Sequence, residues 1–135
     1  MKIIECPRDA MQGINQFIPT EQKIDYINML LKVGFHTIDF GSFVSPKAIP
    51  QMKDTEDVLT GLEINDTSTK LLSIIANIKG LNQAIQFNEI EYIGFPFSIS
   101  EIFQKRNTNK NIDQSLSMLY EIQNKCINAD KKLVV

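Results

Sequence analysis

Near the middle of the chain, residues 70–76 read KLLSIIA, a run that is apolar at nearly every position. A strand with one face in water alternates apolar and polar residues, whereas a strand covered on both faces is apolar almost throughout. The run therefore predicts a buried strand of a parallel sheet, and the segments on either side decide which kind of sheet it belongs to.

Four shorter strands are expected around this run, at residues 2–6, 37–40, 91–95 and 132–135. Helical periodicity lies between them, at residues 20–33, around 54–62, at 80–86, and in a longer helix that Asn111 caps. The segment after Pro7, residues 41–52 and the basic segment 104–107 are expected to be loops. Strands that alternate with helices over short connections predict an α/β fold with parallel strands. Periodicity alone does not separate a small open sheet from the first half of a (β/α)8 barrel.

Composition sets limits on the partners of the chain. The 135 residues form one expected domain, 1–135, with 14 Lys+Arg against 16 Asp+Glu and a net charge of −2. A near-neutral chain lacks the basic surface that nucleic acid needs, and no apolar run approaches the roughly 20 residues of a membrane span. The first residues do not resemble a signal peptide, and Cys6 and Cys126 lie far apart in the sequence. We therefore expect reduced thiols in a cytoplasmic protein without nucleic-acid or membrane partners.

The candidate chemical residues follow the predicted strands, because the chemistry of an eightfold barrel lies at the carboxyl ends of its strands. Arg8 and Asp9 come after the first strand, Asp39 and Ser42 after the second, and Lys79 after the third. Arginine is a permanent cation for an oxyanion, and aspartate is an oxygen ligand for a divalent cation. A surface ion pair is the alternative interpretation of Arg8 and Asp9.

Several longer motifs resemble one enzyme family. Residues 5–12, ECPRDAMQ, are similar to the opening Pro-Arg-Asp-Gly-Leu-Gln signature of 3-hydroxy-3-methylglutaryl-CoA lyases. Residues 37–52, TIDFGSFVSPKAIPQM, resemble the second strand and loop of the same lyases, and residues 77–80 and 100–107 match further segments in the right order. The resemblance covers essentially the whole chain but only about the first half of the family's length. It implies the amino-terminal half of a (β/α)8 barrel from a metal-dependent superfamily.

The resemblance also implies a reaction and its catalytic residues. The family cleaves a 3-hydroxy-3-methylglutaryl-CoA-like thioester to acetyl-CoA and acetoacetate by a metal-dependent retro-Claisen step, a reaction associated with leucine degradation. Arg8 would stabilise the developing enolate, and Asp9 would be a ligand of a divalent cation, Mg²⁺ or Mn²⁺. Asp39 would orient the arginine and the metal's surroundings. Two departures are Ala10, which replaces a glycine, and Asp39, which replaces a longer glutamate.

The same comparison implies a binding surface for the acyl-CoA substrate. Gln12 matches a position near the metal and the substrate, and Ser42 matches a residue that lines the substrate pocket. Lys79, with Lys105 and Arg106, would face the phosphates of CoA, although screened surface charge is an equal alternative for these basic residues.

Two other functions stay open at this point. One is a synthase of the same superfamily that forms the carbon–carbon bond, and the other is a non-catalytic half barrel. The family's histidine ligands lie beyond the position that corresponds to Val135, so we expect the 135-residue chain to be inactive alone. A half barrel exposes strand edges and apolar surface, which predicts a homo-oligomer.

Overall fold

The computed structural model describes the backbone of residues 1–135 and every side chain except that of Asn107. Five strands of this chain form one sheet, in the order β1-β2-β3-β4-β5, and all four pairings are parallel. The strands are β1 (Ile4–Glu5), β2 (Thr37–Phe43), β3 (Lys70–Ile75), β4 (Ile90–Gly94) and β5 (Lys132–Val134). The predicted α/β fold with parallel strands is confirmed.

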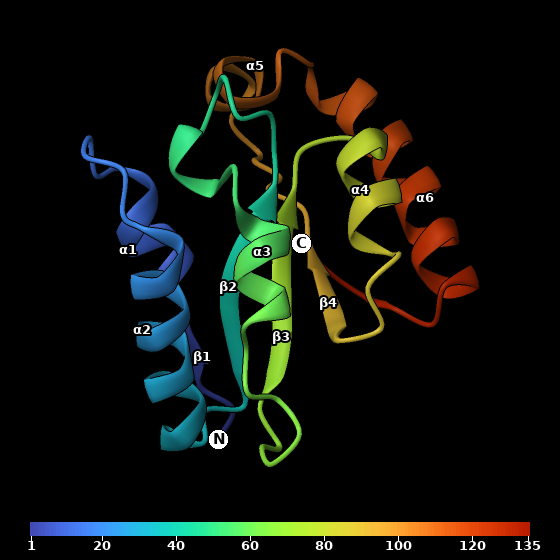
Figure 1. The fold of residues 1–135 in the computed structure, drawn as a ribbon. Helices are drawn as coiled ribbons and strands as arrows, with labels where there is room; N and C mark the ends of the chain where they lie inside the picture. The colour runs from blue at the N-terminus through green and yellow to red at the C-terminus, as the bar shows by residue number, and fades with distance from the viewer.

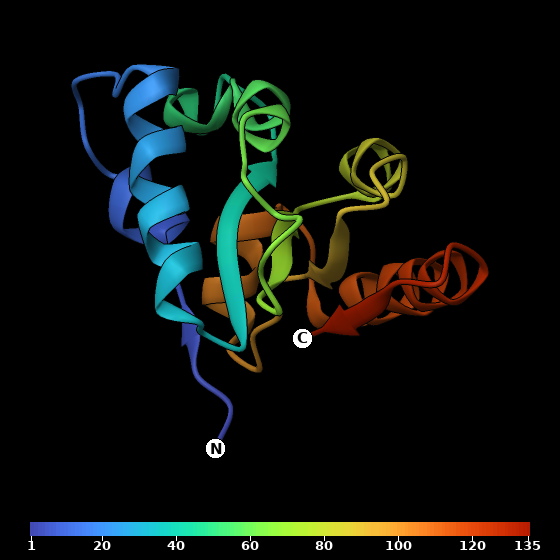
Figure 2. The same cartoon turned by 60° about the horizontal axis from the view of Figure 1, so that its bottom comes forward.

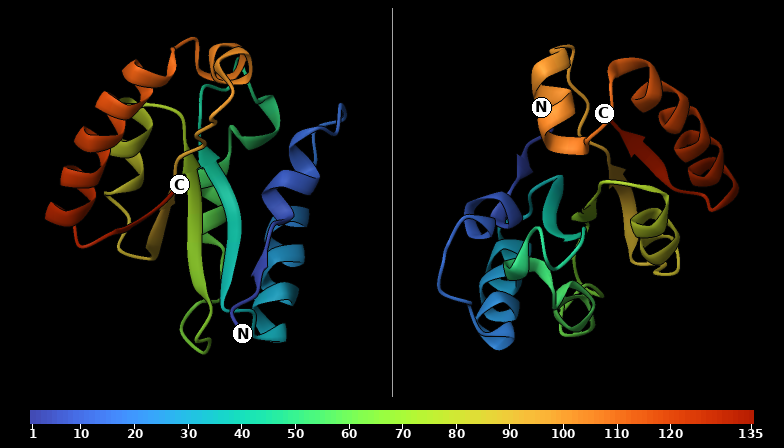
Figure 3. Two further views of the ribbon diagram at one scale, coloured as in Figure 1. Left: turned by 180° about the vertical axis from the view of Figure 1, so that it is seen from behind. Right: turned by 90° about the horizontal axis from the view of Figure 1, so that it is seen from above.

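The sheet is curved, and most helices lie on its convex face. These outer helices are α2 (Thr20–Val33), α3 (Thr55–Thr60), α4 (Ile78–Ala84) and α6 (Ile112–Asn128) (Figures 1 and 2). Two shorter helices, α1 (Pro7–Gln12) and α5 (Glu101–Thr108), follow β1 and β4. Figure 3 shows α5 on the concave side of the arc, near the carboxyl ends of the strands. The convex face is thus closed by helices, and the concave face carries the groove described below.

The main core lies between the strands and the outer helices. Ile27 and Leu31 of α2, Ile38 of β2 and Ile122 of α6 are at most 3% exposed there. Close packing leaves no room at Gly80 of α4, where a Cβ atom would collide with the carbonyl oxygen of Phe43. This glycine therefore lets α4 approach the end of β2.

One extra residue in β2 interrupts the regular pairing of β2 with β3. Asp39 pairs with Leu72 and Gly41 pairs with Ser73, so Phe40 has no partner of its own. A bulge of this kind re-aims the neighbouring side chains. Phe40 enters the helix-side core, while Asp39 lines the concave face.

The structure corrects three predicted segments in the first part of the chain and a fourth at residues 104–107. The segment after β1 is a helix, because Pro7 occupies the first helical position, where its missing N–H costs nothing. β2 runs on to Phe43 instead of ending at Phe40, since pairing with β3 resumes after the bulge. Part of the expected loop 41–52 is a 3₁₀ helix, η1 (Pro50–Met52).

The expected basic loop 104–107 lies inside α5. Ser100 caps this helix by accepting a hydrogen bond from the N–H of Phe103. The Gln104 side chain is buried, and its Nε2 donates to Ser115 Oγ of α6 at 2.6 Å. Gln104, which was predicted to lie in a basic loop, thus connects α5 to α6 through a buried hydrogen bond.

Both cysteines are free thiols: Cys6 is exposed, and Cys126 is a buried residue of α6. In the part of the chain that the structure describes, no helix combines the length and the apolarity needed to cross a membrane.

Candidate active site

A groove of about 560 Å³ lies on the concave face, toward the carboxyl ends of the strands. Its floor is apolar and includes Leu72, Ile74 and Val134. One side of the groove is polar and is formed by Arg8, Asp9, Gln12 and Asp39. The combination of an apolar floor with a few convergent polar groups is typical of a small-molecule site.

A second hollow, of about 550 Å³, lies at the opposite end of the sheet, where the strands begin. Three lysines and three acidic residues line it, so that its charges balance, and Glu91 of β4 pairs with Lys70 at 3.1 Å and with Lys132 at 2.6 Å. In barrels of parallel strands the chemistry lies at the carboxyl ends of the strands, and the opposite face serves stability. The groove beside Arg8 is therefore the candidate active site.

The central contact of this site joins Arg8 of α1 to Asp39 of β2. Arg8 Nη2 donates to Asp39 Oδ2 at 2.6 Å, and Arg8 Nε lies 3.1 and 3.2 Å from the two carboxylate oxygens. The side chains are 13% and 5% exposed, respectively. A two-pronged, charge-assisted contact of this kind fixes the plane of the guanidinium group as well as its position.

The remaining donor of the guanidinium group is held within α1 itself. Arg8 Nη1 donates to Gln12 Oε1 at 2.9 Å and to Asp9 Oδ1 at 3.2 Å, and Gln12 Nε2 donates to the same Asp9 oxygen at 2.8 Å. Gln12 lies four residues after Arg8 and three after Asp9, on the same face of the helix, which explains why it meets both side chains. Ala10 lies inside the helix, where φ is negative, so the alanine in place of glycine is accommodated.

Burial and the contact between Arg8 and Asp39 both shift the pKa values of these two side chains. Burial alone would lower the pKa of Arg8, but the hydrogen bonds and charge of Asp39, followed by Asp9, raise it above its ordinary value. Burial raises the pKa of the Asp39 carboxyl, and the contact with Arg8 offsets only part of that effect. Burial, followed by the charge of Asp39, also raises the pKa of the Cys6 thiol beside the groove. Arg8 is therefore the permanent cation of the site.

The other predicted site residues lie apart from this cluster. Ser42 is 2% exposed and lies beside a separate hollow of about 180 Å³, with Met52 and Thr55. Its hydroxyl is without a hydrogen-bond partner among the described residues. Lys79 is exposed in the first turn of α4. The structure thus brings together Arg8, Asp9, Gln12 and Asp39, while the substrate contacts assigned to Ser42 and Lys79 stay predictions.

Phe103 of α5 lines the groove and was missed by the sequence analysis. A signal for the helix that carries Phe103 was present, because Ser100 is a favoured N-cap residue and Glu101 is an acidic residue in the first turn. A loop was predicted instead because the basic residues Lys105 and Arg106 follow; both are exposed in α5.

The residues described here do not complete a site for Mg²⁺ or Mn²⁺. Such a hard cation takes about six oxygen ligands. The Asp9 side chain is 64% exposed. The Asp39 side chain is only 5% exposed, and both of its carboxylate oxygens accept hydrogen bonds from Arg8. No group of three or more His, Cys, Asp or Glu side chains that could hold a metal occurs among the described residues. Asp9, whose Oδ1 accepts from Arg8 and Gln12, is the exposed carboxylate of the cluster.

Comparisons with known proteins agree on one family. No family model matches the chain. It is 37% identical over 123 residues to the mitochondrial hydroxymethylglutaryl-CoA lyase of Bos taurus, covering 90% of this chain and 37% of that protein. It is 35% identical over 118 residues to a hydroxymethylglutaryl-CoA lyase of Bacillus subtilis, covering 87% of this chain and 39% of the relative.

Solved structures give the same result. The crystal structure of a Bacillus subtilis HMG-CoA lyase superposes with a TM-score of 0.91 at 32% identity, over 98% of this chain and 44% of that one. An HMG-CoA lyase from Acinetobacter baumannii, in complex with coenzyme A and 3-methylmalate, gives a TM-score of 0.88 at 33% identity, over 98% and 43%. The chain thus spans 37–44% of the length of these four proteins.

Proposed function

Because this chain belongs to the hydroxymethylglutaryl-CoA lyase family over the part of those proteins that it spans, we propose that it supplies the anion-stabilising part of a carbon–carbon lyase site. The proposed reaction is cleavage of a 3-hydroxy-3-methylglutaryl-CoA-like thioester to acetyl-CoA and acetoacetate. The observation that carries this proposal is the Arg8 guanidinium group, which Asp39 and Gln12 hold in one orientation at the polar side of an apolar groove.

The cleavage creates negative charge at one place. The hydroxyl group at C3 loses its proton and becomes a ketone, and the C2–C3 bonding electrons move toward the thioester carbonyl, which becomes an enolate. Proton uptake at C2 then gives the methyl group of acetyl-CoA. A preorganised cation beside the developing enolate lowers the barrier, because it interacts more strongly with the transition state than with the neutral thioester.

Each neighbour of Arg8 has a part in this arrangement. Asp39 and Gln12 fix the guanidinium group before the substrate arrives, so that little reorganisation is needed during the reaction. Asp9 is proposed to contribute one carboxylate to a divalent cation, with the other ligands outside the described cluster. The apolar floor at Leu72 and Ile74 suits the hydrocarbon part of the acyl group.

The test is an assay of the complete protein that carries residues 1–135, called the full-length protein below. The protein is given 3-hydroxy-3-methylglutaryl-CoA and Mg²⁺, and acetyl-CoA and acetoacetate are measured. Arg8→Lys keeps the charge but loses the planar, forked donor set. We expect kcat to fall on the order of 100- to 1,000-fold, as when one oxyanion donor is removed, with a smaller change in KM. Lys32→Gln is the control, because Lys32 is exposed and its partner is Glu63 on the surface.

Each contrary result has a definite meaning. If Arg8→Lys raises KM and leaves kcat unchanged, Arg8 binds the ground state and has no role in stabilising the enolate. If the folded protein forms the hydroxyacyl-CoA from acetyl-CoA and a keto acid but does not cleave it, the protein is a synthase. If it does neither, the proposed activity is wrong.

A further inference from the structure

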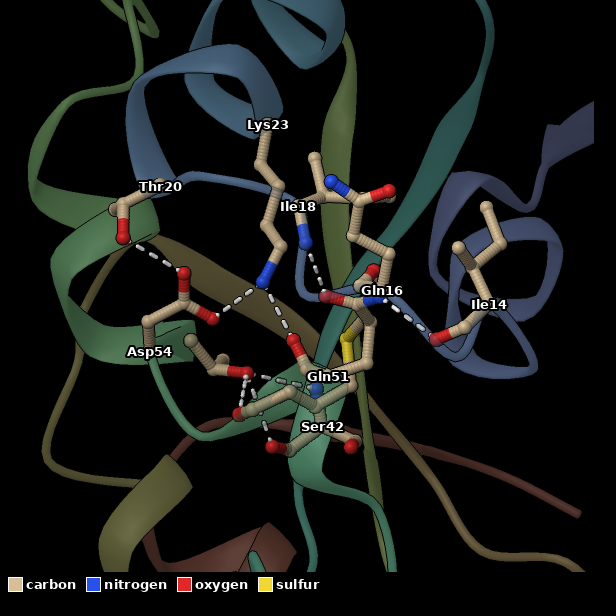
Figure 4. A network of polar contacts seen from close by, with 10 residues as sticks. Ile14, Gln16, Ile18, Thr20, Lys23, Ser42, Gln51 and Asp54 are labelled. Carbon is tan, nitrogen blue, oxygen red and sulfur yellow. Dashed lines mark hydrogen bonds and ion pairs between the residues drawn. The ribbon is translucent and has the colours of Figure 1, made fainter.

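A buried glutamine ties down the segment that follows α1. Gln51, in η1, is 3% exposed, and its side chain bonds only to main-chain groups of residues 14–18. Gln51 Nε2 donates to the carbonyl oxygens of Ile14 and Gln16, each at 3.0 Å, and Gln51 Oε1 accepts from the N–H of Ile18 at 2.9 Å (Figure 4). Both N–H donors and the oxygen of the Gln51 amide thus bind residues 14–18, which are called the tied segment below.

A buried lysine in turn fixes the backbone of the glutamine. Lys23 of α2 is 1% exposed, and its Nζ donates to the carbonyl oxygen of Gln51 and, at 2.7 Å, to Asp54 Oδ1. The ring of Phe17 lies 4.2 Å from the same ammonium group, which adds a cation–π contact from the tied segment itself. Figure 4 shows Lys23 pointing between Asp54 and Gln51.

The tied segment follows α1, the helix that carries Arg8, Asp9 and Gln12 of the candidate site. α1 has only six residues, and a helix this short depends on tertiary contacts to keep its place. Its first turn is held by the contact between Arg8 and Asp39. Its carboxyl end passes through Gln12, which bonds to both Arg8 and Asp9, into Ile14, whose carbonyl oxygen Gln51 holds.

We infer that Gln51 is a positioning residue for Arg8, because it anchors the end of α1 that Asp39 does not reach. This inference rests on the proposed function of Arg8. Loss of the amide frees Ile14, Gln16 and Ile18 and lets the carboxyl end of α1 turn, which shifts Gln12 and releases Arg8 Nη1. A displacement of about 1 Å at a reacting group costs on the order of 100-fold in rate.

The experiment uses Gln51→Met in the full-length protein, since methionine keeps the length of the side chain and removes all three hydrogen bonds. The matched control is Gln86→Met, because Gln86 is exposed in the turn after α4 and its side chain donates to the carbonyl oxygen of Asn82, away from residues 14–18. Two quantities are measured: kcat for thioester cleavage per folded molecule, and the ¹H–¹⁵N signal of Arg8 Nε–H, assigned by its disappearance in Arg8→Lys. We expect Gln51→Met to shift or broaden that signal and to lower kcat on the order of 100-fold, while Gln86→Met changes neither.

An unchanged Arg8 signal in folded Gln51→Met overturns the inference, because it shows that the segment can be released without moving the guanidinium group. If Gln51→Met does not fold, Gln51→Asn replaces it, since asparagine keeps a neutral amide but is one methylene too short to reach the carbonyl oxygens of Ile14 and Gln16 and the N–H of Ile18 together. The same shift is expected, and its absence is again decisive against the inference. If the wild-type protein cleaves no thioester, the proposed function fails, while the Arg8 signal still decides whether Gln51 positions Arg8.

Discussion

The substitution Lys23→Met tests the buried ion pair beneath the tied segment. Methionine keeps the apolar stem of the lysine, so little volume is lost from the core. What disappears is the ammonium group, which bonds to Asp54 at 2.7 Å and to the carbonyl oxygen of Gln51. Asp54 then keeps only the hydrogen bond that Thr20 Oγ1 donates at 2.8 Å.

The expected cost follows from the burial of the pair. The side chains of Lys23 and Asp54 are 2% and 7% exposed, so water does not replace the missing partner. Breaking a buried pair by removing one member costs about 3–5 kcal/mol, because a charge is left without compensation. That is a large part of the roughly 5–15 kcal/mol that stabilises a typical protein. The double substitution Lys23→Met with Asp54→Asn removes the stranded charge and should recover more than half of the loss.

The assay is urea-induced unfolding of the full-length protein, followed by far-UV circular dichroism. Lys32→Met is the comparison, because the Lys32–Glu63 pair lies on the surface, at 3.5 Å, with both side chains more than two-thirds exposed. A change of at most about 1 kcal/mol is expected there. The reasoning is refuted if Lys23→Met costs as little as Lys32→Met, or if the double variant is no more stable than Lys23→Met.

Two further predictions concern Asp39 and Gly80. Burial raises the pKa of Asp39, so the folded state binds this proton more tightly than the unfolded state; the resulting stability is present below the ordinary pKa of 3.8 and is lost as the pH rises through the folded value. Asp39→Asn should abolish this part of the pH dependence in urea unfolding, and an identical loss in both proteins would contradict it. Gly80→Ala forces a Cβ atom against the carbonyl oxygen of Phe43 and should destabilise the fold by about 1–3 kcal/mol, as overpacking does. Gly13→Ala meets open space and should be neutral or stabilising in thermal unfolding, so an equal loss at both glycines would exclude the clash as the cause.

Much of the architecture could be predicted because its signals are local. Residues 70–76 are apolar enough to require cover on both faces, and β3 lies at Lys70–Ile75. Asn111 caps α6 as predicted, and Gln114 completes a capping box with it. The contact between Arg8 and Asp39 agrees with what the family resemblance implied, with Arg8 in the helix directly after β1 and Asp39 within β2.

The features that were missed depend on contacts between distant parts of the chain. A six-residue helix such as α1 has no periodicity to detect, and the bulge at Phe40 exists only in relation to β3. Lys23 occupies an inward position of α2, four residues before the buried Ile27, which indicates a buried charge. Its partner, Asp54, lies 31 residues away and could not be identified from spacing.

The strands occupy the sheet in the order in which they occur along the chain, and each pairs with its predecessor. During synthesis, a new strand–helix unit of roughly 30 residues leaves the ribosome every few seconds, at about 5–20 residues per second. Contacts between neighbouring units form far faster than that. The sheet can therefore grow by accretion from the amino terminus, with each emerging strand docking on an edge that is already folded, and no strand has to wait for a distant partner.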